Sequence, residues 1–103
     1  MITNIEIKGA QHPMVYGYGA LMIAEEILGE AWGTKSTAKS SVVLLYACML
    51  NGDNDFPYEF DAFLRLVDTE DGLLDSLNTA LAVQVARWGK PKEGPSDDDK
   101  KKD

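Results

Sequence analysis

The chain has 103 residues, of which 45% are hydrophobic and 26% charged, and its formal net charge is −7 at pH 7. This length suits one domain, and the composition is that of a globular protein, which excludes a wholly disordered or membrane-embedded chain. The longest apolar run, Val42 to Leu50, is too short to cross a bilayer, and the first residues lack a secretory signal pattern. We therefore expect a cytoplasmic protein with no membrane partner.

The excess negative charge belongs to one part of the chain. Residues 1–88 contain twelve acidic and five basic residues, whereas residues 89–103 contain five of each. A body with this charge repels nucleic-acid phosphates, which proteins bind by neutralising them with Lys and Arg. We therefore expect no nucleic-acid partner, and the acidic surface fits basic protein partners or serves solubility.

The chain begins with a pattern typical of β-strands. Ile5 and Ile7 alternate with polar residues, which predicts a strand with one buried face. Met14 and Tyr16 repeat at the same spacing after a short turn. Together they predict a β-hairpin over residues 2–16, which must pack against the helices that follow because an isolated hairpin is marginal in water.

Four segments then predict helices, at about residues 18–28, 37–51, 57–68 and 71–88. In the first, apolar residues recur three and four apart, while Glu25 and Glu26 fall together on the other side. Ser36 or Thr37 can cap the second helix. Because the run Val42 to Leu50 contains no charged residue, we expect this helix to be central and covered on most sides.

Pro57 is expected in the first turn of the third helix, where its missing N–H costs nothing. The last helix places five apolar residues near one face: Leu74, Leu77, Leu81, Val85 and Trp88. Residues 89–103 are rich in charge and proline and predict a disordered charged tail. The fold class is therefore mainly α with a short N-terminal β-hairpin (α+β), a small four-helix domain in which residues 1–88 form a single globular unit.

No residue pattern predicts catalysis, a cofactor or a metal. Cys48 is the only cysteine and lies within the apolar run, so a buried thiol is expected. His12 is the only histidine, which excludes a metal site or triad that needs a second one, and it is expected on the surface of the hairpin. The cluster of Asp53, Asp55 and Glu59 suggests a calcium loop, but Leu64 stands where the closing glutamate would be, so loop and helix-capping chemistry is the better interpretation.

Four residues are candidates for contacts with other proteins. Trp32 in a loop and Trp88 at the end of the last helix occupy positions where interface anchors often occur, and Leu74 and Leu81 supply apolar helix surface. The competing interpretation is that both tryptophans cover the core.

The order of these parts resembles the tail assembly chaperones of long-tailed bacteriophages. The likeness covers residues 1–88 and rests on an opening strand, an aromatic-Ala-Leu helix start and an apolar helix that ends at an acidic loop, here Ile5–Gly9, Tyr16–Leu21 and Asn51–Asp53. The resemblance implies a phage or prophage protein of the bacterial host cytoplasm that binds the tape measure protein and keeps it soluble during tail tube assembly. It also implies absence from the mature virion, self-association into a homo-oligomer, and a frameshifted longer form that recruits the tail tube protein.

Two other hypotheses fit the residues. An acidic DNA mimic would present carboxylates at phosphate-like spacing to a basic DNA-binding protein, and salt would weaken that binding more than it weakens apolar helix capture. A small enzyme would need a pocket around a carboxylate such as Glu25 or Asp61.

Overall fold

The structure is a computed structural model that describes residues 2–30 and 37–88. Its elements follow the chain in the order β1 (Thr3–Ile7), β2 (Ala10–Met14), α1 (Tyr18–Leu28), α2 (Ala38–Gly52), α3 (Phe60–Thr69) and α4 (Leu73–Trp88). A two-stranded antiparallel hairpin followed by four helices is the small α+β fold that the sequence predicts, so the predicted fold class is confirmed. Trp32 and the predicted tail, residues 89–103, lie outside the described residues.

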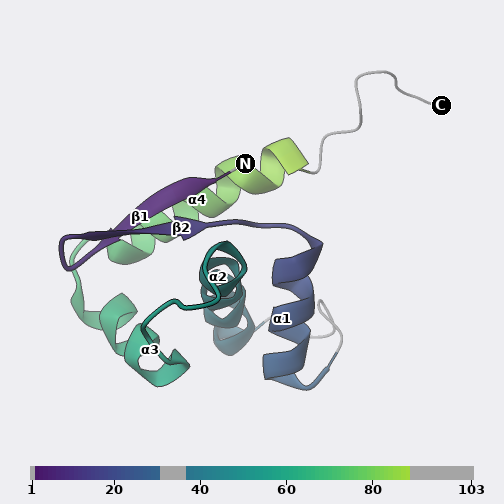
Figure 1. Ribbon diagram of the computed structural model, residues 1–103. Helices are drawn as coiled ribbons and strands as arrows, with labels where there is room; N and C mark the ends of the chain where they lie inside the picture. The colour runs from purple at the N-terminus through teal and green to yellow at the C-terminus, as the bar shows by residue number, and fades with distance from the viewer. Residues whose placement is uncertain (1, 31–36, 89–103) are drawn as a thin grey trace.

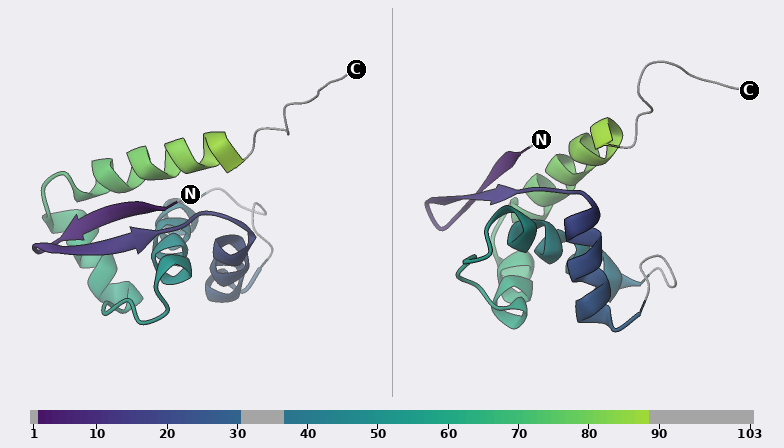
Figure 2. Two further views of the ribbon diagram at one scale, coloured as in Figure 1. Left: turned by 45° about the horizontal axis from the view of Figure 1, so that its top comes forward. Right: turned by 45° about the vertical axis from the view of Figure 1, so that its right-hand side comes forward.

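The hairpin lies along α4, which also contacts α2 and α3 directly. In Figure 1, α2 lies between α1 and α3, and the left view of Figure 2 shows α4 next to the hairpin. α2 contacts β2, and α4 contacts β1. None of the helices in the described ranges is long and apolar enough to span a membrane.

The hairpin presents one face to the core. Ile5 pairs with His12 and Thr3 with Met14, and the turn is the two-residue step Lys8–Gly9, whose positive φ angles of 51° and 84° are those of the turn that matches strand twist. The strands end at Met14, two residues before the predicted end of the hairpin. The chain leaves the sheet there because the Val15 N–H donates to the Cys48 carbonyl oxygen at 3.0 Å instead of to a strand.

His12 is buried, so its predicted place on the surface is wrong. Only 8% of the residue is exposed, and its ring meets those of Phe56 and Tyr58 edge to face, with centroids 5.2 and 6.1 Å apart. The cause is the two-residue period of a strand, which puts His12 on the same face as Met14. Within the described residues its Nε2 atom has no hydrogen-bond partner.

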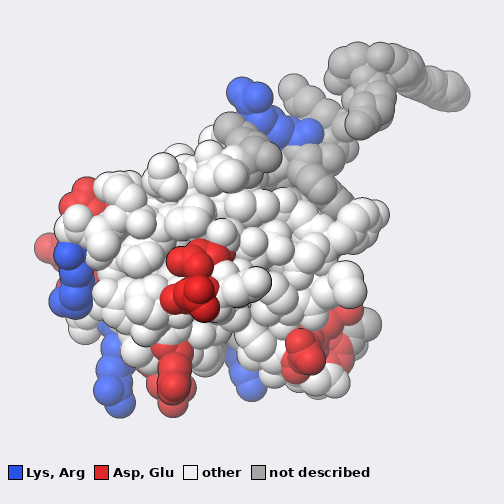
Figure 3. Space-filling model, in the orientation of Figure 1, with Lys and Arg blue, Asp and Glu red and all other residues white. Residues whose placement is uncertain are grey.

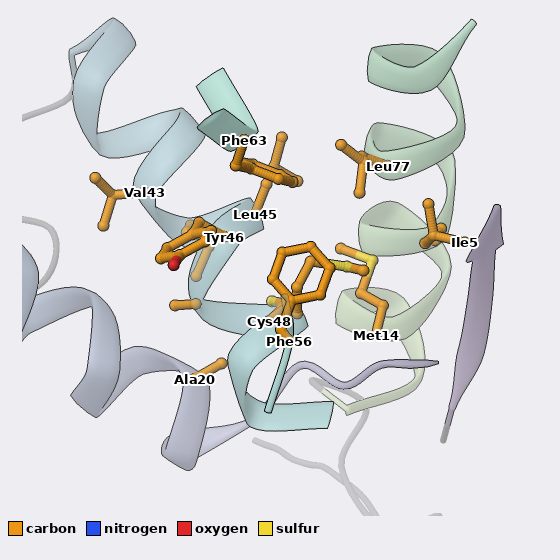
Figure 4. Packing of buried hydrophobic residues seen from close by; sticks show 14 of the residues in the cluster. Ile5, Met14, Ala20, Val43, Leu45, Tyr46, Cys48, Phe56, Phe63 and Leu77 are labelled. Carbon is orange, nitrogen blue, oxygen red and sulfur yellow. The ribbon is translucent and has the colours of Figure 1, made fainter. Parts of the chain in front are cut away.

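α2 is the central helix, as predicted. Thr37 caps it through a capping box, in which the Ser40 N–H donates to Thr37 Oγ1 and the Thr37 N–H donates to Ser40 Oγ. Every residue from Val43 to Met49 is buried. Figure 4 shows how side chains of α2 meet those of the strands, α1 and α4 in one apolar cluster.

α1 packs very closely on α2. Ala20 and Ala24 of α1 are fully buried, and a Cβ atom at Gly19 would stand 2.4 Å from the Asn51 side-chain oxygen. The Asn51 amide in turn donates to the Val15 carbonyl oxygen at 3.0 Å. Small residues on α1 thus allow the close approach, and Asn51 ties the end of α2 to the segment that enters α1.

The last two helices begin later than predicted. α3 begins at Phe60, so the placement of Pro57 in its first turn is wrong. The segment before it is held as a loop because Phe56 is buried in the aromatic cluster and the Tyr46 hydroxyl donates to the Tyr58 carbonyl oxygen at 2.7 Å. α4 begins at Leu73 instead of residue 71 because Gly72 has a φ of 78°, which no α-helix accommodates.

The buried face of α4 also differs from the predicted one. Its buried residues are Leu73, Leu77, Ala80 and Gln84. Gln84 is only 2% exposed, although glutamine is usually found at the surface. Its amide is fully used. Nε2 donates to the Met14 carbonyl oxygen at 2.8 Å and to Thr3 Oγ1 at 3.1 Å, and Oε1 accepts the Tyr16 N–H at 2.7 Å.

Replacing Gln84 with methionine is expected to lower the free energy of unfolding by about 2 to 4 kcal/mol, because the variant removes one buried and two partly buried hydrogen bonds, including the one that the Tyr16 N–H donates to Gln84. Urea denaturation followed by circular dichroism measures the change. Gln11→Met, on the exposed face of the same hairpin, is the matched control and should stay within about 0.5 kcal/mol of the parent. Equal losses in the two variants would contradict a special role for Gln84.

Candidate interaction surface

The acidic residues of the described chain do not gather into a metal-binding group. Within residues 2–30 and 37–88, His, Cys, Asp and Glu side chains nowhere gather in a group of three that could hold a metal ion. Asp53 instead shapes the loop after α2, since its carboxylate accepts the Asp55 N–H at 2.9 Å and its carbonyl oxygen accepts the Phe56 N–H at 2.9 Å. The prediction of loop chemistry is therefore confirmed for Asp53, whereas Glu59, the residue before α3, makes no side-chain cap.

Cys48 is buried, as predicted, and its thiol is held in the protonated form. The residue has no exposed surface and packs in the middle of α2. Burial raises the pKa of the Cys48 thiol from 9.0 to about 12, because the apolar surroundings disfavour the thiolate. The thiolate is the nucleophilic form of cysteine, so this thiol is unsuited to react at neutral pH.

Exposed apolar side chains gather on two helices. On α1, Tyr18 is 71% exposed and Met22 is 66% exposed, and their spacing of four residues makes them neighbours on the face opposite Ala20 and Ala24. Large apolar residues at this exposure are uncommon for a helix that only covers a core. We define Tyr18 and Met22 as the α1 apolar pair.

α4 carries a second exposed apolar row. Leu74 is 41% exposed and Val85 is 39% exposed, and Leu81 lies between them along the same flank, half-buried against the core. We define these three residues as the α4 apolar row. Two of the predicted interaction residues, Leu74 and Leu81, thus lie on one flank. Trp88 is the last residue of α4, and its side chain is not among those described.

The α1 apolar pair is absent from the sequence prediction. The sequence could have indicated this pair. The helix at residues 18–28 has too many apolar residues for one face, so some of them must point away from Ala20 and Ala24. The α4 apolar row was partly predicted, since Leu74 and Leu81 were named as candidate interaction residues and Val85 was placed on the same face of the helix.

On the side of the molecule seen in Figure 3, the charged side chains are separated by uncharged surface. The acidic side chains stand there in separate places, with wide uncharged areas between them. A surface that imitates a nucleic-acid backbone would instead repeat its negative charges at short, regular spacing. This face therefore does not have the charge pattern of a DNA mimic.

Comparison of the chain with models of protein families, with curated proteins and with solved structures found no match.

The raised pKa of Cys48 predicts a pH dependence of stability. A thiol that ionises at about 12 in the folded state and at 9.0 in the unfolded state stabilises the fold fully below pH 9.0. This contribution is lost as the pH rises from 9.0 toward 12, because the unfolded state alone then gains by releasing the proton.

We expect urea denaturation between about pH 8 and about pH 11 to show a steeper loss of stability for the parent protein than for Cys48→Ala. The alanine variant is the control for all other ionising groups, including Tyr46, whose pKa is also raised by burial and by the nearby Glu59 carboxylate. Parallel pH profiles for the two proteins would contradict the shifted thiol.

Proposed function

We propose that this protein is a tail assembly chaperone of a long-tailed phage or prophage, which binds the tape measure protein and keeps it soluble while the tail tube forms. It acts by binding and not by catalysis. The observation that carries the proposal is the pairing of an acidic helical body with exposed apolar residues on two helices, the α1 apolar pair and the α4 apolar row. The order of elements that suggested this family supports it as well.

The two apolar surfaces suit a helical partner. An amphipathic helix is bound by apolar residues that recur at three or four positions along a facing helix, and Tyr18 and Met22 have this spacing, as do Leu81 and Val85. A long helical protein that exposes its apolar faces would otherwise aggregate. Covering those faces with copies of a strongly acidic chaperone supplies both apolar burial and solubility.

The remaining features follow from the same proposal. The chaperone works in the cytoplasm of the infected bacterium, coats its partner as several copies and is absent from the finished virion. A longer form made by ribosomal frameshifting recruits the tail tube protein. Intact mass measurement of all products of the native gene, expressed with its downstream DNA and an N-terminal tag, tests this part, and a minor longer product is expected.

Co-expression with the tape measure protein of the same genome tests the main function. The parent chain is expected to raise the soluble yield of the tape measure protein about tenfold or more, and the complex should persist as salt is raised, because apolar contacts are not screened. The double variants Tyr18→Ser with Met22→Ser and Leu74→Ser with Val85→Ser should lose much of this effect while keeping the parent circular dichroism spectrum.

The matched control exchanges exposed polar residues of the same two helices, Glu26→Gln with Asn78→Ser, and should behave like the parent. Unchanged tape measure solubility in both serine variants would overturn the proposal. Salt-sensitive capture of a basic DNA-binding protein, without any effect on the tape measure protein, would favour the DNA mimic in its place.

A further inference from the structure

One edge of the hairpin is left open. Pro13 has no N–H and pairs with Asn4, so the doubly bonded pairs of the ladder are those on either side of it, and the backbone groups of Asn4 and Glu6 point away from β2. Among the described residues, no hydrogen bond from a turn, loop or side chain reaches these groups. β1 therefore offers two N–H donors and two carbonyl acceptors along its free edge.

The opposite edge of the hairpin is closed. A Cβ atom at Gly52 would stand 2.3 Å from the Pro13 carbonyl oxygen, which shows that the end of α2 lies directly against β2. The next residue, Val15, donates its N–H to Cys48 of α2. Only the β1 edge can thus accept another strand.

A groove runs beside this open edge. It has a volume of about 530 Å³ and lies between β1 and the flank of α4 that carries Asp75, Thr79 and Val83. Val83 is 41% exposed and Ala80 forms part of the floor, so the groove has an apolar stretch next to the strand. Its shape suits a strand added beside β1, whose inward side chains would cover α4.

The surroundings of this edge are acidic. Asp75 lines the groove, and a second hollow of about 380 Å³ at the turn end of β1 is lined by Glu6, Glu70 and Asp71. Among residues 2–30 and 37–88, Lys8 is the only basic residue that lines either hollow, and it is paired with Glu70 at 3.3 Å. The edge therefore presents unbalanced negative charge to whatever occupies it.

We propose that the open edge of β1 binds an extended segment of a partner protein in which basic side chains alternate with apolar ones, so that the segment becomes a third strand of the sheet. Backbone bonds to Asn4 and Glu6 hold it, its basic side chains lie on the outer face beside Glu6, and its apolar side chains lie on the inner face against Val83 of α4. A second copy of the chain fits less well, because antiparallel pairing of two β1 strands about Ile5 would make the two Glu6 carboxylates diagonal neighbours on one face and would bring two acidic bodies together. This site takes a strand and thus extends beyond the helix binding proposed above.

Nuclear magnetic resonance titration of the full chain tests the site with a defined probe, a synthetic peptide of about six residues in which valine alternates with lysine. We expect the largest shifts at the amides of Asn4 and Glu6, with slower hydrogen exchange at both. A peptide with glutamate in place of lysine should bind about tenfold or more weakly. A lysine peptide N-methylated on the bonding edge should also lose binding, because it cannot form the ladder.

Two variants locate the binding. Asn4→Pro removes an outward N–H that the fold itself does not use, and Gln11→Pro makes the same change on the other strand as its control. Glu6→Gln removes the charge beside the expected basic side chains without touching the backbone, and Glu26→Gln is its control on α1. The proposal requires weaker binding for the first variant of each pair only, and Glu6→Gln provides the deciding measurement if Asn4→Pro fails to fold.

Equal binding of the glutamate and lysine peptides, or shifts confined to α1, would overturn the site. Light scattering that reveals a dimer dissociated by Asn4→Pro, but unaffected by the lysine peptide, would also overturn it and assign the edge to a second copy.

Discussion

The position of the hairpin depends on the buried amide of Gln84. Two strands alone cannot form a stable sheet in water, so the hairpin needs both an apolar contact and a fixed orientation. Ile5, Ile7 and Met14 supply the contact, which by itself would tolerate sliding along α4. The Gln84 amide has two donors and an acceptor in fixed directions, and it holds Thr3, Met14 and Tyr16 at once, so it fixes the register between α4 and both strands.

This orientation determines which surfaces remain outside. Gln84 turns Leu73, Leu77 and Ala80 into the core, and the α4 apolar row is consequently left along the flank. The same rotation sets the other flank of α4 beside β1, where the groove forms. The orientation of α1 does not depend on Gln84, because its small residues pack against α2. This packing leaves Tyr18 and Met22 facing outward. The protein thus has exposed apolar helix surfaces and an open strand edge at separate places on its surface.

Much of the fold could be predicted because its signals are local. Alternation in Ile5 and Ile7, the uncharged run from Val42 to Leu50 and the cap at Thr37 each depend on neighbouring residues alone, and each led to a correct element. The errors arose where contacts with residues distant in the sequence determine the local structure. Pro57 lies in a loop because Phe56 and Tyr58 pack on residues of other elements, and a glutamine at position 84 gives no sign in the sequence that β1 and β2 will satisfy its amide.

The candidate interaction surfaces were likewise predictable only where local sequence determines them. Leu74 was identifiable as apolar helix surface, but its exposure depends on how α4 is rotated about its axis. The sequence cannot give that rotation, because apolar residues lie on more than one side of this helix. The open edge of β1 was partly readable, since a two-stranded hairpin always has two outer edges and Pro13 weakens one as a donor. That α2 would close the β2 edge required the close approach at Gly52, which is a tertiary contact.

The bond from Gln84 to Thr3 joins residues 81 positions apart, so the first strand completes its contacts with nearly the last described turn of helix. A chain made on the ribosome exposes Ile5 and Ile7 long before α4 has been synthesised, and α1 and α2 can pair with each other in the meantime because they are adjacent in sequence. Closing so long a loop is an entropic barrier that local helix pairing does not face. During synthesis β2 can pack on α2 as soon as both have been made, whereas β1 gains its contacts with α4 only as the final helix emerges.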